Sequence, residues 1–289
     1  YDYEHARCDF SKVQQPLNGN GETKSLEQFN RSLHFGQFTP RFSMQYLSSH
    51  NQLFYASVSK GYKAGGFNVS FLNNDDYLYS PEYNWNYEIG TKLSFLNNRL
   101  SADLSLFYID WRNQQITNTI PTVGNVIRNA GRSRNKGIEA SFQARPTKSW
   151  VMYMNYGYTD ARFVHYQKEE RGILKDYGGN YLPMVPRHTF SLTTGYSFYD
   201  ICSWIDRLTL NAGVSVTGPI YWYEDNQAKQ SPYALVNLRI SINKGCFTWE
   251  AWSKNLTNTD YLSYYFVTSK AYAQKGKPIT LGTSVSISL

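Results

Sequence analysis

Residues 208–217 read LTLNAGVSVT and alternate strictly between two kinds of side chain. Apolar residues such as Leu210 and Val214 occupy every second position, and small polar residues such as Thr209 and Ser215 stand between them. Successive side chains of a β-strand point to opposite faces, so this segment predicts a strand with one apolar and one polar face. The same period occurs at residues 100–106, 138–145, 189–198 and 234–243.

The alternating segments are long. Each spans about ten residues, roughly twice the usual length of a strand in a soluble protein, whereas a strand that crosses a membrane needs about 9–11. Counting segments with a period of two predicts about twelve strands. They lie near residues 1–8, 38–48, 52–63, 85–96, 99–113, 132–145, 149–163, 187–198, 206–217, 232–243, 246–255 and 279–289.

The connections between these strands alternate in length, which is a second indication of the fold. Tight links are expected at residues 49–51, 97–98, 146–148, 199–205 and 244–245. Long polar and aromatic stretches lie between them, at residues 9–37, 64–84, 114–131, 164–186, 218–231 and 256–278. Outer-membrane barrels have short turns on the periplasmic side and long loops outside the cell. The sequence therefore predicts an all-β, antiparallel transmembrane β-barrel; the alternative is a soluble antiparallel sandwich, whose strands are shorter.

The composition agrees with a barrel in the outer membrane. Charged residues make up 18% of the 289 residues, and the chain has 25 Tyr, 16 Phe and 7 Trp. The net charge is +7, but Lys and Arg are scattered, which argues against nucleic-acid binding. Aromatic residues near strand ends are typical of the girdles that barrels place at the headgroup level. The expected girdle residues are Trp111, Trp150, Tyr158, Phe163, Phe198 and Trp249.

Residues with catalytic or metal-binding potential form no known pattern. Cys8, Cys202 and Cys246 make no CxxC pair; Cys202 and Cys246 could form a disulfide if their strands are neighbours, but we favour three free thiols. No HExxH motif and no phosphate-binding glycine loop occurs. We therefore expect no catalytic residue, no cofactor and no metal site. Among other classes of function, a barrel enzyme or a passive porin is the alternative.

Five sequence motifs resemble those of the TonB-dependent outer-membrane receptor family. Residues 55–68 (YASVSKGYKAGGFN) are similar to its YxSxSKGxxxGGFN motif, and residues 80–90 (SPEYNWNYEIG) to its PExxxNYExG motif. The other three are LFYIDWRNQQI at 106–116, NAGRSRNKGIE at 129–139 and YALVNLRISINKGCFTWEAWSKNLTNTDY at 233–261. We interpret them as signatures of the fold first: Glu82 and Glu88 are expected to pair with cations, and Asn255 to cap a strand end.

The resemblance implies an active-transport receptor in the outer membrane of a Gram-negative bacterium. Such a receptor captures a scarce nutrient, and the TonB-ExbB-ExbD complex of the inner membrane supplies the energy through an amino-terminal plug domain. Barrels of this family have 22 strands around a plugged lumen. Residues 1–289 are therefore expected to be the carboxy-terminal part of the barrel, without the plug and the TonB box. The implied partners are the plug, that complex, outer-membrane lipid and a small-molecule metal chelate.

Cargo and contact residues follow from the resemblance and from the composition of the long loops. The first expectation is a ferric siderophore; cobalamin, haem and oligosaccharides are the alternatives within the family. Aromatic loop residues can stack on flat groups of a cargo, and basic loop residues can attract an anionic chelate. The candidate ligand-binding residues are Trp222, Tyr223, Tyr264, Tyr265, Lys168 and Arg171, and Lys175 belongs to the same basic set.

Overall fold

The protein is built from β-strands. The computed structural model describes residues 1–14, 24–49, 52–71, 76–120, 123–129, 131–170, 173–267 and 270–288. All the secondary-structure elements named along the chain are strands, as the period of two predicted. Within the described residues, no helix is long and apolar enough to cross a membrane.

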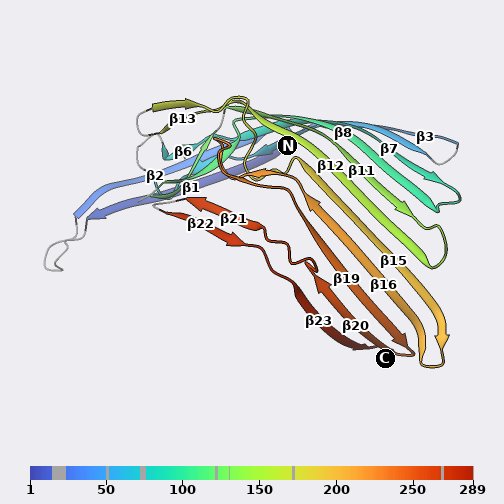
Figure 1. Cartoon of the computed structure of the whole chain (residues 1–289). Helices are drawn as coiled ribbons and strands as arrows, with labels where there is room; N and C mark the ends of the chain where they lie inside the picture. The colour runs from blue at the N-terminus through green and yellow to red at the C-terminus, as the bar shows by residue number, and fades with distance from the viewer. Residues whose placement is uncertain are drawn as a thin grey trace.

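Eleven strands form one antiparallel sheet, in which each strand pairs with the members before and after it in the chain. Figure 1 shows this sheet as a single curved wall. Its two edge strands, the first and the last of the series, do not pair with each other. The members are β3 (Arg41–Leu47), β4 (Leu53–Lys63), β7 (Glu82–Phe95), β8 (Leu100–Arg112), β11 (Arg132–Ala144), β12 (Trp150–His165), β15 (His188–Cys202), β16 (Ile205–Thr217), β19 (Tyr233–Lys244), β20 (Phe247–Lys254) and β23 (Thr280–Ile287).

Tight turns lie at one end of the sheet, which we call the tight-turn end (Figure 1). The turn between β7 and β8 places Leu96, Asn97 and Asn98 at positive φ, and Gly245 has a φ of 52° between β19 and β20. Glycine and asparagine tolerate this left-handed conformation best, which explains their use here. Cys202 and Cys246 lie at two of these turns, and all three thiols of the chain are free. The predicted link at 49–51 falls partly outside the described residues.

Six two-stranded sheets lie in the long connections, at the other end of the main sheet, which we call the hairpin end (Figure 1). They are β1 (Asp2–Gln14) with β2 (Lys24–Gln37), β5 (Gly66–Phe67) with β6 (Leu78–Tyr79), β9 (Gln115–Ile120) with β10 (Gly124–Asn129), β13 (Gln167–Glu170) with β14 (Ile173–Asp176), β17 (Ile220–Tyr221) with β18 (Lys229–Gln230), and β21 (Leu262–Val267) with β22 (Ala271–Lys275). The long connections thus contain short paired strands of their own, which the sequence analysis did not predict. The strand expected near residues 1–8 is likewise part of β1, outside the main sheet. Their backbones pair locally, so they need no two-faced alternation of side chains.

The register of the main sheet keeps apolar residues on one face and small polar residues on the other. Ile89 of β7 lies opposite Leu106 of β8, which lies opposite Ile138 of β11. These three side chains remain 56%, 48% and 43% exposed. On the opposite face, Asn155 lies beside Ser191. An exposed apolar face and a polar inner face are the reverse of a soluble core and are typical of a transmembrane barrel.

Three of the expected girdle residues, Trp150, Phe198 and Trp249, are exposed near the tight-turn end of the main sheet. Phe163 is only 2% exposed and packs with Tyr166 in a buried cluster at the hairpin end, so its assignment to the girdle was wrong. Trp111 lies an odd number of residues from the outward Leu106 in an unbroken strand, so it faces inward. The period of two therefore already excludes Trp111 from the outward girdle, whereas the burial of Phe163 depends on tertiary packing.

Candidate functional site at the hairpin end

Asn68, the last residue of the motif at residues 55–68, joins two small hairpins to each other. Asn68 is 4% exposed, and its side-chain amide donates to the carbonyl oxygens of Asp76 (2.7 Å) and Ile127 (2.8 Å). The amide oxygen of Asn68 accepts from the Ile127 N–H at 2.8 Å. The guanidinium of Arg128 donates twice to the Asp76 carboxylate, at 2.6 Å each. A buried, fully bonded amide of this kind holds β5–β6 against β9–β10.

Further motif residues hold strand ends in place. The side chain of Gln115 donates to the Ala64 carbonyl oxygen at 2.7 Å. Asn129 donates to the carbonyl oxygens of Asn113 (2.7 Å) and Ser80 (2.8 Å), and accepts from the Ser80 N–H. Each bond joins segments that are remote in the sequence. These motifs are therefore structural, as predicted.

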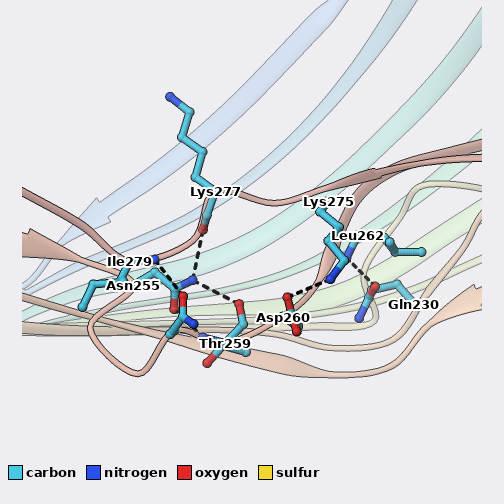
Figure 2. Close-up of polar contacts among 9 residues, drawn as sticks. Gln230, Asn255, Thr259, Asp260, Leu262, Lys275, Lys277 and Ile279 are labelled. Atoms are coloured by element: carbon cyan, nitrogen blue, oxygen red, sulfur yellow. Dashed lines mark hydrogen bonds and ion pairs between the residues drawn. The ribbon is translucent and has the colours of Figure 1, made fainter.

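Asn255 caps the end of β20, as predicted (Figure 2). Its side chain donates to the carbonyl oxygens of Thr259 and Lys277, both at 3.0 Å, and accepts from the Thr259 N–H at 2.8 Å. Its φ of 48° is left-handed, a conformation that asparagine tolerates. One residue thus fixes where β20 ends and where the chain returns from the β21–β22 hairpin.

Of the two motif glutamates, Glu82 pairs with a cation, as expected, whereas Glu88 has no such partner among the described residues. Glu82 lies 4.0 Å from the ammonium of Lys63. Glu88 instead accepts a hydrogen bond from the Tyr55 hydroxyl at 2.6 Å, and its pairing with a cation was wrong. The Tyr55 ring lies over Gly90, where an added Cβ would come within 2.5 Å of the ring. The tyrosine of the YxSxSKG motif therefore packs across the glycine of the ExG motif.

Four of the candidate binding residues form one aromatic cluster, which we call the ring cluster: Trp222, Tyr223, Tyr264 and Tyr265. The Trp222 ring centroid lies 6.4 Å from those of both Tyr264 and Tyr265, and Tyr223 meets Tyr265 edge to face at 6.2 Å. The cluster joins the β17–β18 hairpin to the β21–β22 hairpin. Only tertiary packing could bring these residues together, because about forty residues separate the two pairs.

The residues of the ring cluster differ in how deeply they are buried. Trp222 is 5% exposed, and its indole N–H has no hydrogen-bond partner among the described residues. Burial raises the pKa of the Tyr223 hydroxyl above its ordinary value, although a hydrogen bond from the Val267 N–H opposes the shift. Tyr223 is therefore a neutral phenol at physiological pH. Tyr264 is 43% exposed and presents a ring to the surroundings.

The basic candidates differ in position. Lys168 on β13 donates to the carboxylate of Glu224 at 2.7 Å, and Glu224 is 9% exposed. This ion pair connects β13 to the loop that carries the ring cluster. Lys175 is exposed on β14, and Arg171 lies outside the described residues.

An exposed face of the β21–β22 hairpin contains two rings that the sequence analysis missed. Phe266 and Tyr272 lie opposite each other and stack with centroids 5.0 Å apart at 12°. Tyr264, two residues before Phe266, lies 5.7 Å from that ring. We call Tyr264, Phe266 and Tyr272 the exposed ring face; they are 43%, 39% and 47% exposed. The spacing of Tyr264 and Phe266 is a period-two signal, but the pairing with Tyr272 depends on the register of the hairpin.

Long two-faced strands, tight turns at one end and interlocked hairpins at the other define an outer-membrane β-barrel protein. A family model described as "TonB dependent receptor-like, beta-barrel" matches residues 6–258. The chain belongs to the TonB-dependent receptor family, whose members lie in the outer membrane of Gram-negative bacteria. It is a family of receptors for transport rather than of enzymes.

Individual relatives cover most of this chain. It is 26% identical over 241 residues to the probable TonB-dependent siderophore receptor PiuA of Acinetobacter baumannii, across 78% of this chain and 30% of the relative. It is also 26% identical over 262 residues to the pesticin receptor of Yersinia pestis, across 87% of this chain and 36% of the relative. The chain thus spans about a third of the length of the curated relatives it matches.

The fold is shared with solved structures of the family. The ferric yersiniabactin uptake receptor FyuA from Yersinia pestis superposes with a TM-score of 0.77 at 22% identity, over 99% of this chain and 42% of that one. The siderophore receptor PiuA from Acinetobacter baumannii superposes with a TM-score of 0.71 at 20% identity, over 91% of this chain and 38% of that one. The agreement extends over nearly the whole chain and identifies the curved sheet as one wall of a receptor barrel.

Proposed function

We propose that this chain is the carboxy-terminal part of the barrel of a receptor that captures a ferric siderophore outside the cell and imports it with energy from TonB. Family membership supports the transport class. The names of relatives, which include a siderophore receptor and a ferric yersiniabactin uptake receptor, support the cargo class. The observation in this molecule that carries the proposal is the exposed ring face, held at the hairpin end by the buried ring cluster.

The exposed ring face suits a ferric siderophore for a physical reason. Tyrosine and phenylalanine rings give a large contact area to flat organic groups at a low entropic cost, and the tyrosine hydroxyls can bond polar edges. Lys270 and Lys275 on the same hairpin are exposed and add positive charge. Lys275 contacts Asp260 at 3.3 Å, but both side chains are more than 70% exposed, so this surface pair holds the lysine only weakly.

The partners follow from the same proposal. The polar inner face of the sheet would contact the plug domain of the full-length chain, and that plug would carry the TonB box to the TonB-ExbB-ExbD complex. Depressions on the inner face are lined by polar groups that include Glu139, Asn155 and Arg239. Such groups can exchange hydrogen bonds with a polar plug surface.

Uptake of labelled cargo tests the function. The full-length receptor gene is expressed in a Gram-negative strain that lacks its own iron receptors, and the cells are offered iron-55 complexes of catecholate, hydroxamate and mixed siderophores. Unlabelled competition by haem, cobalamin and oligosaccharides runs in parallel. We expect binding and TonB-dependent uptake of at least one ferric siderophore. Uptake of cobalamin or an oligosaccharide without any siderophore would contradict the cargo.

Substitution of the exposed ring face tests the site. A stacked ring contributes about 1 kcal/mol, so replacing Tyr264, Phe266 and Tyr272 together by alanine should weaken siderophore binding about 100-fold. The control is Trp204→Ala, because Trp204 is an aromatic residue that is 82% exposed at the tight-turn end. If the two variants bind the siderophore with equal affinity, the exposed ring face is not part of the binding site. That result would not contradict the proposed transport function.

A further inference from the structure

Two histidines lie directly opposite each other on the β1–β2 hairpin. His5 of β1 pairs with His34 of β2, and their rings are stacked, with centroids 4.4 Å apart and planes 1° from parallel. The register of the hairpin shifts only between Lys12 and Val13, so the pairing is regular at the two histidines. Residues that face each other in this way have Cβ atoms about 4.5–5.5 Å apart, so the backbone itself holds the two imidazoles together.

Tyr3 adds a hydroxyl group to this pair. It lies two residues before His5, on the same face of β1, and its oxygen is 2.8 Å from Nδ1 of His34. A histidine that donates its Nδ1–H to such an oxygen keeps the lone pair of Nε2 for another ligand. Outer hydrogen bonds of this kind fix the tautomer and the ring orientation of metal-binding histidines. We call Tyr3, His5 and His34 the His–Tyr cluster.

The His–Tyr cluster faces away from the other hairpins. Phe10 lies on the opposite face of β1 from His5, and its ring packs against Phe71 with centroids 5.3 Å apart. The three side chains of the cluster are exposed, Tyr3 by 61%. A small ion in solution can therefore reach both imidazoles without displacing any residue that the structure describes.

The charges beside the His–Tyr cluster allow a cation to approach. Arg7 follows His5 by two residues on the same face, and its guanidinium lies 3.5 Å from the carboxylate of Asp9, so these two charges offset each other. The described residues contain no group of three or more His, Cys, Asp or Glu side chains that could hold a metal ion. The cluster therefore offers two nitrogen ligands, fewer than the four ligands of a closed structural site, and leaves positions for water.

We propose that His5 and His34 bind one divalent transition-metal ion, of the zinc, copper or nickel type, between β1 and β2. Imidazole nitrogen suits these ions, whereas Mg²⁺ and Ca²⁺ prefer oxygen ligands. A tetrahedral ion with metal–nitrogen bonds of about 2.0 Å needs the two nitrogens about 3.3 Å apart. Small side-chain rotations reach this separation from stacked rings whose centroids are 4.4 Å apart. The bound ion clamps the two strands of a long hairpin outside the main sheet (Figure 1), and it uses no residue of the exposed ring face.

Metal titration of the full-length receptor, purified in detergent without a histidine tag, tests the proposal. Binding of Zn²⁺, Cu²⁺, Ni²⁺ and Mg²⁺ is measured by calorimetry. The variant with both His5→Gln and His34→Gln should bind one Zn²⁺ ion fewer than the wild type, and Mg²⁺ should not distinguish the two proteins. Tyr3→Phe keeps the ring but removes the outer hydrogen bond, so it should weaken Zn²⁺ binding about 10-fold. Paramagnetic resonance of bound Cu²⁺ should show nitrogen ligands that the double variant loses.

His188→Gln is the matched control. A ring nitrogen of His188 also lies 3.0 Å from a tyrosine hydroxyl, that of Tyr156, but the residue opposite His188 on β12 is Tyr158 instead of a second histidine. This variant should bind as many ions as the wild type. A measurement on the unmutated protein avoids any effect of substitution on folding: Zn²⁺ should protect His5 and His34, but not His188, from diethylpyrocarbonate.

Three results would overturn the proposal. The first is a double variant that binds as many Zn²⁺, Cu²⁺ and Ni²⁺ ions as the wild type, including the case in which neither protein binds any. The second is a loss in His188→Gln as large as that in the double variant. The third is equal modification of His5 and His34 with and without Zn²⁺.

Discussion

Asn255 offers the sharpest test of how this sequence sets the geometry of its hairpin end. The side chain makes three hydrogen bonds to backbone groups of Thr259 and Lys277, is 4% exposed, and has a φ of 48°. Replacement by alanine removes all three bonds and places an ordinary side chain in left-handed backbone. Replacement by glycine removes the same bonds but has no conformational penalty.

The expected losses can be worked out from these contacts. Three hydrogen bonds at about 1 kcal/mol each give about 3 kcal/mol for Asn255→Gly. The left-handed backbone adds about 1 kcal/mol for alanine, so Asn255→Ala should cost about 4 kcal/mol. Asn97→Ala is the matched control, because Asn97 has a φ of 54° in an exposed turn and its side chain makes no hydrogen bond to any residue that the structure describes. The free energy of unfolding of Asn97→Ala should fall only by the cost of placing alanine in left-handed backbone, about 1 kcal/mol.

The assay is guanidinium unfolding of the full-length receptor in phospholipid vesicles, followed by tryptophan fluorescence. The free energy of unfolding should fall in the order wild type, Asn97→Ala, Asn255→Gly, Asn255→Ala. A loss below 1 kcal/mol for Asn255→Ala would refute the assignment of Asn255 as the residue that holds the end of β20. Equal losses for the alanine and glycine variants would refute the backbone part of the reasoning.

Three further predictions concern topology, packing and pH. A cysteine at Gln227, which is exposed in a long connection, should react with an impermeant reagent on intact cells, whereas one at Asn98 should not; the opposite pattern would invert the topology. Gly90→Ala should destabilise the barrel by about 1–3 kcal/mol, because its Cβ would lie 2.5 Å from a tyrosine ring, whereas Gly213→Ala, with 3.6 Å to the nearest atom, should be tolerated in the same unfolding assay. Burial raises the pKa of Tyr77 to about 12, so the unfolded state loses its proton first, and stability should fall as pH rises from about 10 to about 12. Melting temperatures at pH 9 and pH 11.5 should show a smaller alkaline loss for Tyr77→Phe, and an equal loss would contradict this cause.

The topology test uses Gln227 because of what the structure shows about its neighbour. The neighbouring residue Asn226 lies in the same long connection and would be a poorer position for the cysteine. The Asn226 side chain accepts from the Tyr181 N–H at 2.7 Å and donates to the Tyr181 carbonyl oxygen at 2.9 Å, so a cysteine there would break a link between two loops. Gln227 is exposed and its side chain makes no contact of this kind among the described residues.

The sequence by itself determined the strands, their two faces and the alternation of tight and long connections. These features are local: side chains alternate along any extended chain, and glycine or asparagine at a turn acts through its own backbone. The motifs likewise predicted the family, because residues such as Asn68 and Asn255 are needed wherever the same strand ends must be held. The hairpins inside the long connections escaped prediction because their pairing needs no alternation of apolar and polar side chains.

Only the tertiary structure decided which candidate residues meet and which are accessible. Lys168 and Glu224 are 56 positions apart in the chain, yet they form an ion pair. Trp222 is buried, whereas Phe266 and Tyr272 present the exposed rings, although all are aromatic residues in long connections. Composition can supply rings and charges to a loop, but burial and pairing depend on contacts between segments that are distant in sequence. Those contacts are fixed by the register of the sheet and the packing of the hairpins above it.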